Sequence, residues 1–331
     1  MIPVSLPGGN FYVTMALSLV CLATLLTWAA SLARSRDARW WLSDHRKLGS
    51  VLMAMLAVGG AVFPYQQLSH WLDSQRLARA DAALRTVLAQ ARNLAGVAMP
   101  AGTELRLRKQ DDPESFEEAR FPVPTPVAGV KAERLLRHFD AAGTSASWSL
   151  ALAGNETIAG WLCSRGHKAE FRLRGSQPEF SSCHLASGNR IEEQNLPAGT
   201  WLTATPEGWL LRTGGSESLR VEGLDLLKAD VRLDGGHRRT HFEGLLAHES
   251  VLGDVTYPAG TRVSAAGAKV PGAQPGDLLL SPSRGRSAHR AGGSEIAAGK
   301  SVLQAPDGTV RSVLSNREAG VLDVASVRLG P

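Results

Sequence analysis

Two cysteines and two histidines form the most reactive cluster in the sequence. Cys163 and Cys183 stand twenty positions apart, each beside a segment with strand-like alternation, and His167 and His184 flank them. These side chains offer sulfur and imidazole ligands for zinc, but structural zinc sites space their ligands two to four residues apart in both halves. In an oxidising compartment the pair is better explained as a disulfide, which we predict. Two buried, unpaired thiols are the remaining alternative.

A second group of metal-ligand types follows at His237, His241 and His248, beside Glu243 and Glu249. An H-x3-H pair on a helix would face one way and bind a metal ion. The surrounding sequence is typical of turns and strands, so that geometry is lost, although a spacing of four also keeps two strand residues on one face. We therefore expect surface histidines, and we predict no metal site and no cofactor.

Catalytic signatures are missing from the sequence. There is no G-x-S-x-G, no H-E-x-x-H, no phosphate-binding G-x-x-x-x-G-K-[ST] and no G-x-G-x-x-G after a strand. We predict a protein that is not an enzyme. A pair of carboxylates across a cleft has no sequence signature, which keeps an enzyme open as the alternative.

The composition indicates a folded chain of one or two domains. Of 331 residues, 44% are hydrophobic and 20% are charged, and the formal net charge is +5. Much of the positive excess lies in the first 72 residues, which hold five Lys and Arg against two Asp and Glu. The remaining residues are almost balanced and show no basic face with interleaved aromatics, so we expect no nucleic acid partner.

Two apolar segments predict a membrane hairpin over residues 1–72. No charged side chain precedes Arg34, and spans of about 11–33 and 48–70 are long enough to cross a bilayer as helices. Cys21 falls inside the first span. A cleaved signal peptide would have a basic start and a shorter apolar core. For the second span the alternative is a buried helix of a soluble core, with Pro64 near its end.

The loop at 34–47 sets the expected orientation. It holds five basic residues, which by the positive-inside rule places it in the cytoplasm, and Trp40 and Trp41 suit the lipid headgroup region. The large C-terminal part then lies outside the cytoplasm. Arg76, Arg79 and Arg85 follow the second span closely and favour the opposite orientation, which is the alternative. The predicted location is a bacterial inner membrane with multi-pass topology and the C-terminal domain in the periplasm.

Residues 73–96 predict a helical stalk that continues the second span to Gly96. Strong helix formers dominate, and small or apolar residues recur at heptad spacing. The heptads are few, so the expected role is packing on its own domain, with a homo-oligomer seam as the alternative.

Beyond the stalk, residues 97–331 predict a mainly β extracytoplasmic domain. Alternation in 104–108, 147–152 and 169–174 is typical of strands. One further helix is expected at 130–141, after a proline-rich linker at 121–126. The fold class is thus membrane-anchored and mainly β: two transmembrane helices, a helical stalk and a β-hairpin-repeat domain.

A repeated turn is the most informative feature of this domain. Three copies of Pro-Ala-Gly-Thr and a weaker fourth recur, with turn residues Pro100 and Gly102, Pro197 and Gly199, Pro258 and Gly260, and Gly299. We expect proline at the second turn position and glycine at the fourth or at a positive φ, with a strand restarting after each turn. The irregular spacing favours β-hairpins side by side over a strict solenoid.

The segment from Cys163 to Thr200 resembles the strand-turn-strand repeats of MORN-like envelope β-repeat proteins, and the resemblance covers about residues 150–315. A strand with Phe171, a glycine turn, a polar strand and a Pro-Ala-Gly-Thr turn carry it. The aromatic-glycine core of a standard MORN unit is absent. The resemblance implies a non-catalytic repeat surface and transfers no functional residue.

Together these features predict a membrane-anchored binding or scaffold protein that contacts a protein partner through strand edges or faces. An immunity protein and an accessory of secretion or envelope assembly are two concrete forms. The alternatives are an envelope enzyme and a lipid or glycan carrier acting on cell wall or surface polysaccharide. We expect a basic Ser/Gly-rich stretch at 281–293 to form a loop. The alternative is that this stretch contacts anionic lipid or an acidic partner.

Overall fold

The computed structural model describes residues 9–321 except 269, 284 and 298. They form two compact units that divide between Leu84 and Arg85. We call residues 9–84 the helical unit and residues 85–321 the β unit. The division lies inside the stalk expected at 73–96.

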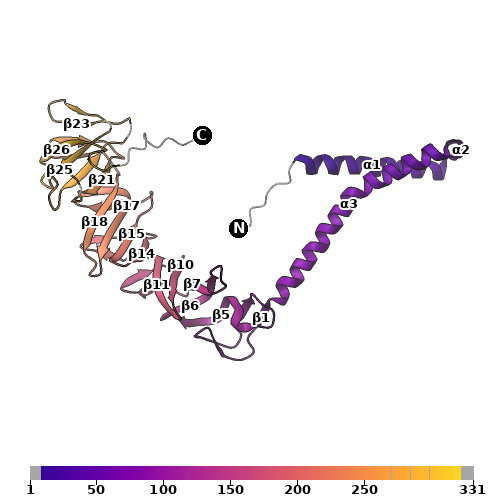
Figure 1. Cartoon of the computed structure of the whole chain (residues 1–331), viewed down its shortest axis with the longest axis horizontal. Helices are drawn as coiled ribbons and strands as arrows, with labels where there is room; N and C mark the ends of the chain where they lie inside the picture. The colour runs from indigo at the N-terminus through magenta and orange to yellow at the C-terminus, as the bar shows by residue number, and fades with distance from the viewer. Residues whose placement is uncertain (1–8, 269, 284, 298, 322–331) are drawn as a thin grey trace. The chain divides into compact units, whose positions relative to one another are not determined.

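The helical unit consists of α1 (Gly9–Arg34), α2 (Arg36–Asp44) and α3 (Arg46–Ala83) (Figure 1). α1 and α3 pack side by side, and both are long and apolar enough to cross a membrane. The loop expected at 34–47 is largely the short helix α2, whose N-terminus is capped by the hydroxyl of Ser35.

The second apolar segment and the first part of the stalk are one helix, because Pro64 does not break α3. Proline has no N–H to donate to the carbonyl four residues earlier, which here is that of Gly60. The Ser18 hydroxyl on α1 donates to this carbonyl at 3.0 Å and accepts the N–H of Phe63, also at 3.0 Å. Gly60 lets the helices approach, since a Cβ there would lie 3.1 Å from the backbone of Leu22.

The stalk helix ends at Ala83 and not at Gly96, so that expectation was wrong. Val87 and Leu94, two of the expected heptad residues, lie in β1 and β2 of the β unit. The backbone of 85–87 pairs with a strand at 104–107 instead, because pairing saturates its N–H and C=O groups within the β unit. The homo-oligomer seam, which was the alternative for the stalk, is thereby left with fewer helical heptad positions.

The β unit is built on one antiparallel sheet whose strands mostly follow one another in chain order (Figure 1). Its strands are β1 (Arg85–Val87), β4 (Glu104–Leu107), β5 (Phe116–Val127), β6 (Val130–Phe139), β7 (Ser145–Leu152), β10 (Lys168–Arg174), β11 (Gln177–His184), β14 (Trp201–Thr205), β15 (Gly208–Arg212), β17 (Leu224–Asp234), β18 (Arg239–Leu246), β21 (Arg262–Ala265), β22 (Leu278–Ser281), β25 (Lys300–Gln304) and β26 (Val310–Ser315), with β16 (Leu219–Val221) beside β17. A short 3-10 helix, Pro113–Ser115, precedes β5.

Short strands branch from the sheet and share its core. They are β2 (Arg92–Leu94) with β3 (Val97–Met99), β8 (Glu156–Ile158) with β9 (Trp161–Cys163), β12 (Arg190–Ile191) with β13 (Gln194–Asn195), and β19 (Ser250–Leu252) with β20 (Val255–Tyr257), β23 (Ala288–Arg290) and β24 (Glu295–Ile296). Met99, Trp161 and Tyr257 from these strands are at most 1% exposed and belong to the same hydrophobic cluster as Leu135 and Leu150 of the sheet. The small strands therefore cover one face of the sheet.

The expected strands at 104–108, 147–152 and 169–174 are confirmed as β4, β7 and β10. The helix expected at 130–141 is wrong, because those residues form β6. A register shift between Ala132 and Arg134 interrupts the strand alternation, so that Ala132 and Leu135, three residues apart as on one face of a helix, are both buried. The linker expected at 121–126 lies within β5, where the register also shifts.

The repeated turns share one geometry in their three full copies. In each, threonine donates both its N–H and its hydroxyl to the proline carbonyl, the hydroxyl at 2.7 Å. The glycine N–H donates to a leucine carbonyl, and the same leucine N–H donates to the threonine carbonyl; these leucines are Leu88, Leu185 and Leu246. Proline is thus the first turn residue and glycine the third, at φ between 82° and 83°, which corrects the expected positions.

The weaker fourth copy keeps the turn. Lys300 donates its N–H to Ala297, and Gly299 has a φ of 90°. A two-residue hairpin turn recurs as well and was not expected: Ala95-Gly96, Ala159-Gly160 and Glu222-Gly223 have positive φ at both central positions. This is the conformation that matches the twist of paired strands.

Replacing Gly199 by alanine should destabilise the β unit by about 1–2 kcal/mol, because alanine is strained at positive φ. The site is open, since a Cβ there would meet nothing within 4 Å, so the backbone alone is tested. Gly267→Ala is the matched control, equally open and without a positive φ. Urea midpoints of the full chain in detergent, read by pulse proteolysis, measure the difference; equal midpoints would contradict it.

Candidate functional site

The face of the sheet opposite the small strands carries charged side chains at the start of the β unit. In strand register, Arg85 lies opposite Arg106, and Glu104 lies opposite Arg120. Arg120 in turn lies opposite Arg134 of β6. The alternate positions Leu105, Ala119 and Leu135 are at most 2% exposed, so alternation sends the apolar residues into the core and the charged ones outward.

These residues line a cleft of about 760 Å³, which we call the arginine cleft. It is lined by Arg85, Arg106, Arg120 and Arg134 together with Glu104 and Glu118, from β1, β4, β5 and β6, and by the less polar Thr86, Val87 and Leu105. Four guanidinium groups and two carboxylates line the cleft, and the neighbouring Glu117 pairs with Arg106 at 3.3 Å, so a smaller excess of positive charge remains. Guanidinium groups bind carboxylate and phosphate oxygens through paired hydrogen bonds.

Glu118 organises the cleft. Its carboxylate accepts Nε of Arg120 and lies within 2.8 Å of Nε of Arg134. Burial raises the pKa of the Glu118 carboxyl group, but hydrogen bonds and the positive charges of Arg134 and Arg120 outweigh burial, and its pKa lies below the ordinary value. Glu118 is therefore ionised at neutral pH and holds two of the four guanidinium groups in place.

A hydrogen-bonded chain of His138, Ser149 and Glu170 follows on β6, β7 and β10. Nε2 of His138 lies 2.6 Å from Oγ of Ser149, which donates to Oε2 of Glu170 at 2.6 Å. In a serine hydrolase the histidine lies between serine and carboxylate, whereas here serine is in the middle. Ser149 is also only 2% exposed. The chain therefore links three strands and presents no accessible nucleophile; sequence spacing gave no signal for it, since it depends on register.

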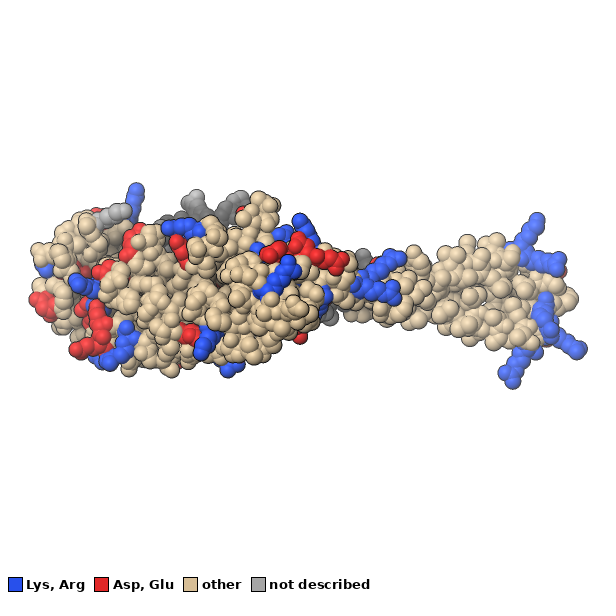
Figure 2. Space-filling model, turned by 90° about the horizontal axis from the view of Figure 1, so that it is seen from below, with Lys and Arg blue, Asp and Glu red and all other residues tan. Residues whose placement is uncertain are grey.

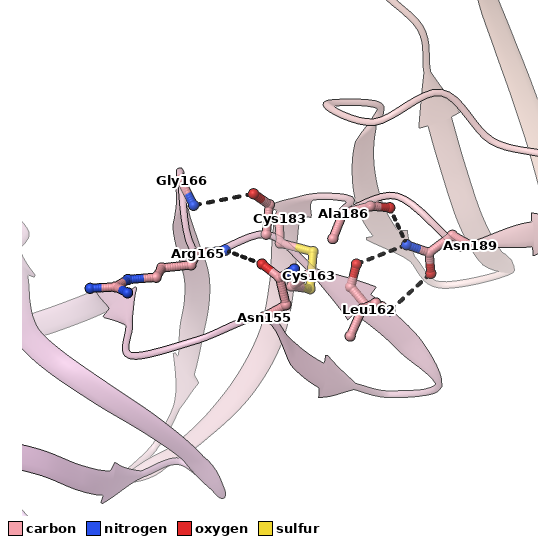
Figure 3. Close-up of a disulfide and its surroundings, with 9 residues drawn as sticks. Asn155, Leu162, Cys163, Arg165, Gly166, Cys183, Ala186 and Asn189 are labelled. Atoms are coloured by element: carbon pink, nitrogen blue, oxygen red, sulfur yellow. Dashed lines mark hydrogen bonds between the residues drawn. A yellow bond between two sulfur atoms is a disulfide. The ribbon is translucent and has the colours of Figure 1, made fainter.

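The structure joins Cys163 and Cys183 in a disulfide, with sulfurs 2.07 Å and Cα atoms 5.9 Å apart (Figure 3). Both cysteines are at most 4% exposed. The Asn189 side chain braces the same region: it accepts the N–H of Leu162 and donates to the carbonyls of Leu162 and Ala186, all within 2.9 Å. A disulfide indicates an oxidising compartment.

His184 cannot join the cysteines in a zinc site. It follows Cys183 in β11 and so points to the opposite face, and both thiols are already bonded. It packs instead edge-on against His167, with ring centroids 4.1 Å apart, and against Trp201 at 4.9 Å. Both ring nitrogens of His184 are buried without a hydrogen-bond partner among the described residues. Burial lowers its pKa, and the nearby His167 lowers it further.

The other three histidines are not brought together. His237 lies in the turn between β17 and β18 and stacks near Trp161, with ring centroids 4.5 Å apart. His241 lies in β18, where burial and then Arg232 lower its pKa. His248 lies beyond β18 and is exposed. Within the described residues no three His, Cys, Asp or Glu side chains form a metal-binding group.

Compared with known proteins, the chain matches no family model, no curated protein and no solved structure. The fold and the arginine cleft therefore rest on the geometry of this chain alone.

The neutral, half-buried His184, whose ring nitrogens are buried, should make the β unit less stable in mild acid. Its pKa is lower folded than unfolded, so the unfolded chain binds more protons as the pH falls through the ordinary histidine value of 6.5. The contribution of neutral His184 to the free energy of unfolding is therefore complete above that value, and it declines as the pH falls from about 7 to about 5. Urea unfolding across this range measures the slope.

His184→Gln should reduce that slope, because one of the groups that takes up a proton on unfolding is removed; His241, whose pKa is also lowered, retains the rest. His248→Gln removes an exposed imidazole and serves as the control, with the parent's pH dependence retained. Identical slopes for the parent and His184→Gln would show that protonation of His184 does not contribute.

Proposed function

We propose that this protein is an inner-membrane-anchored, periplasmic binding or scaffold protein that holds an acidic protein partner in its arginine cleft. The observation that carries the proposal is the cleft itself: four arginines gather on the outward face of paired strands, and they outnumber the two glutamates, Glu104 and Glu118, that line the cleft with them. Carboxylates of a partner would add to this cleft, in which guanidinium groups already pair with Glu117 and Glu118. An immunity protein and a secretion or envelope-assembly accessory remain the two concrete forms.

Anchoring and compartment support this proposal. Two helices of the chain are apolar and long enough to cross a membrane, and the disulfide fits an oxidising space. The basic segment 34–47 between the two apolar spans favours the cytoplasmic side under the positive-inside rule, which puts the β unit in the periplasm. The resemblance to MORN-like repeats also favours a non-catalytic surface.

A binding role fits the cleft better than catalysis. An enzyme needs a nucleophile, acid or base that reaches substrate, and the carboxylate of Glu118 is engaged by arginines while Ser149 is buried. A lipid or glycan carrier stays the alternative class and is one outcome of the test below.

Reversing two cleft charges should abolish capture of the partner. Full-length protein carrying Arg106→Glu and Arg120→Glu is crosslinked mildly in native membranes, purified in detergent and compared with the parent by mass spectrometry. At least a tenfold loss of one stoichiometric protein is expected, because like charges now face each other across the interface.

Arg220→Glu with Arg238→Glu is the matched control, since it makes the same charge change at exposed residues outside the cleft. Equal loss in the control would show that net charge alone matters. Recovery of glycan or lipid without a protein partner would contradict the proposal and favour a carrier.

The periplasmic location predicts one alkylated thiol of three. Protein isolated from native membranes without reductant and denatured in detergent should gain one alkyl group, at Cys21, because the other two cysteines are bonded. After reduction it should gain three. Intact mass measures both; three groups without reductant would place the β unit in a reducing compartment.

A further inference from the structure

A second cavity, of about 580 Å³, lies within the helical unit where the three helices meet. One part of its lining is apolar and comes from Leu32, Leu42 and Met53. The other part is polar and basic and includes Arg39, Ser43 and Arg46. The cavity is therefore amphipathic. Its apolar wall comes from all three helices, and its cationic wall comes from α2 and α3.

Packing fixes α2 beside this cavity. Gly49 of α3 is buried against Leu42 of α2, since a Cβ on Gly49 would clash with a methyl carbon of Leu42. Trp41 of α2 packs edge-on against Trp28 of α1, with ring centroids 6.4 Å apart, and stacks on His45 at 5.1 Å. The three helices thus hold the cavity walls together.

The cationic wall is incompletely neutralised. Arg39 uses its Nε to donate to the carbonyl of Ser35 at 3.3 Å, which leaves its terminal nitrogens available. Arg46 has no ion pair or side-chain hydrogen bond among the described residues. The neighbouring Asp44 lies 3.5 Å from His45. Figure 2 shows blue side chains gathered at this end of the helical unit, while the helices are otherwise mostly tan.

We propose that this cavity binds one anionic phospholipid. The phosphate lies between the guanidinium groups of Arg39 and Arg46, and an acyl chain follows Leu32, Leu42 and Met53. Guanidinium groups suit phosphate oxygens, and basic pockets between membrane helices on the cytoplasmic side suit anionic headgroups. The apolar wall selects a lipid over free phosphate. This inference rests on the membrane anchoring put forward under the proposed function.

Exposed Trp40 agrees with this placement. Its side chain is 71% exposed on α2, and tryptophan is favoured at the headgroup level of a bilayer. A short amphipathic helix at that depth brings Arg39, its neighbour in sequence, to the level of the lipid phosphates.

The test is native mass spectrometry of the full-length protein in detergent, titrated with phosphatidylglycerol or with phosphatidylcholine of the same acyl chains. One phosphatidylglycerol should remain bound, with at least tenfold higher affinity than phosphatidylcholine. Arg39→Gln with Arg46→Gln should lower that affinity at least tenfold. Excess inorganic phosphate should not displace the lipid, because it leaves the apolar wall uncovered.

Arg36→Gln with Lys47→Gln is the matched control: it removes the same charge from the same segment, and neither residue lines the cavity. Equal losses in both double variants would overturn the site in favour of diffuse attraction. Equal affinity for the two lipids, or displacement by phosphate, would overturn it too. Retention of the protein in membranes after alkaline carbonate extraction reports the anchor separately, so a failed lipid site is distinguishable from a failed anchor.

Discussion

The β unit depends on one small interaction, the buried threonine hydroxyl that closes each Pro-Ala-Gly-Thr turn. Thr103, Thr200 and Thr261 are at most 1% exposed, and each donates its hydroxyl to the proline carbonyl that begins its turn. A buried hydroxyl and a buried carbonyl would each be costly without a partner, so the turn satisfies both. Because the glycine and threonine of the turn also bond to a leucine backbone, the turn fixes where the next long strand enters the sheet.

Once the strands enter in register, alternation divides the sheet into two faces with different roles. The small strands cover the inner face, where Leu135 and Leu150 are fully buried. The outward face receives Arg106, Arg120 and their neighbours, which line the arginine cleft. Strand pairing already occupies the backbone N–H and C=O groups, so only side chains on this face are available to contact another molecule. That constraint favours recognition through charge over catalysis on a loop.

Much of the fold follows from local sequence, and its departures have physical causes. Turn residues and alternating strands were predictable because their signals are local. The strand β6 was mistaken for a helix because a register shift spaces Val130, Ala132 and Leu135 irregularly. Likewise, α3 continues through Pro64 because Ser18, which is distant in sequence, satisfies the Gly60 carbonyl. The arginine cleft escaped prediction for the same reason: Arg85 and Arg134 come together through the pairing of four strands.

The disulfide shows how a local and a long-range signal combine. Cysteine spacing and compartment pointed to Cys163 and Cys183, while the fate of His184 was decided by strand geometry, since adjacent residues in β11 face opposite ways. The thiols are therefore committed to the inner face and the imidazole to the outer one. The same rule places His184, Glu170 and the cleft arginines on a common outward face. A partner that contacts this face would meet positive charge near β1 and a neutral imidazole and indole pair at β11 and β14, two chemically different patches on one sheet.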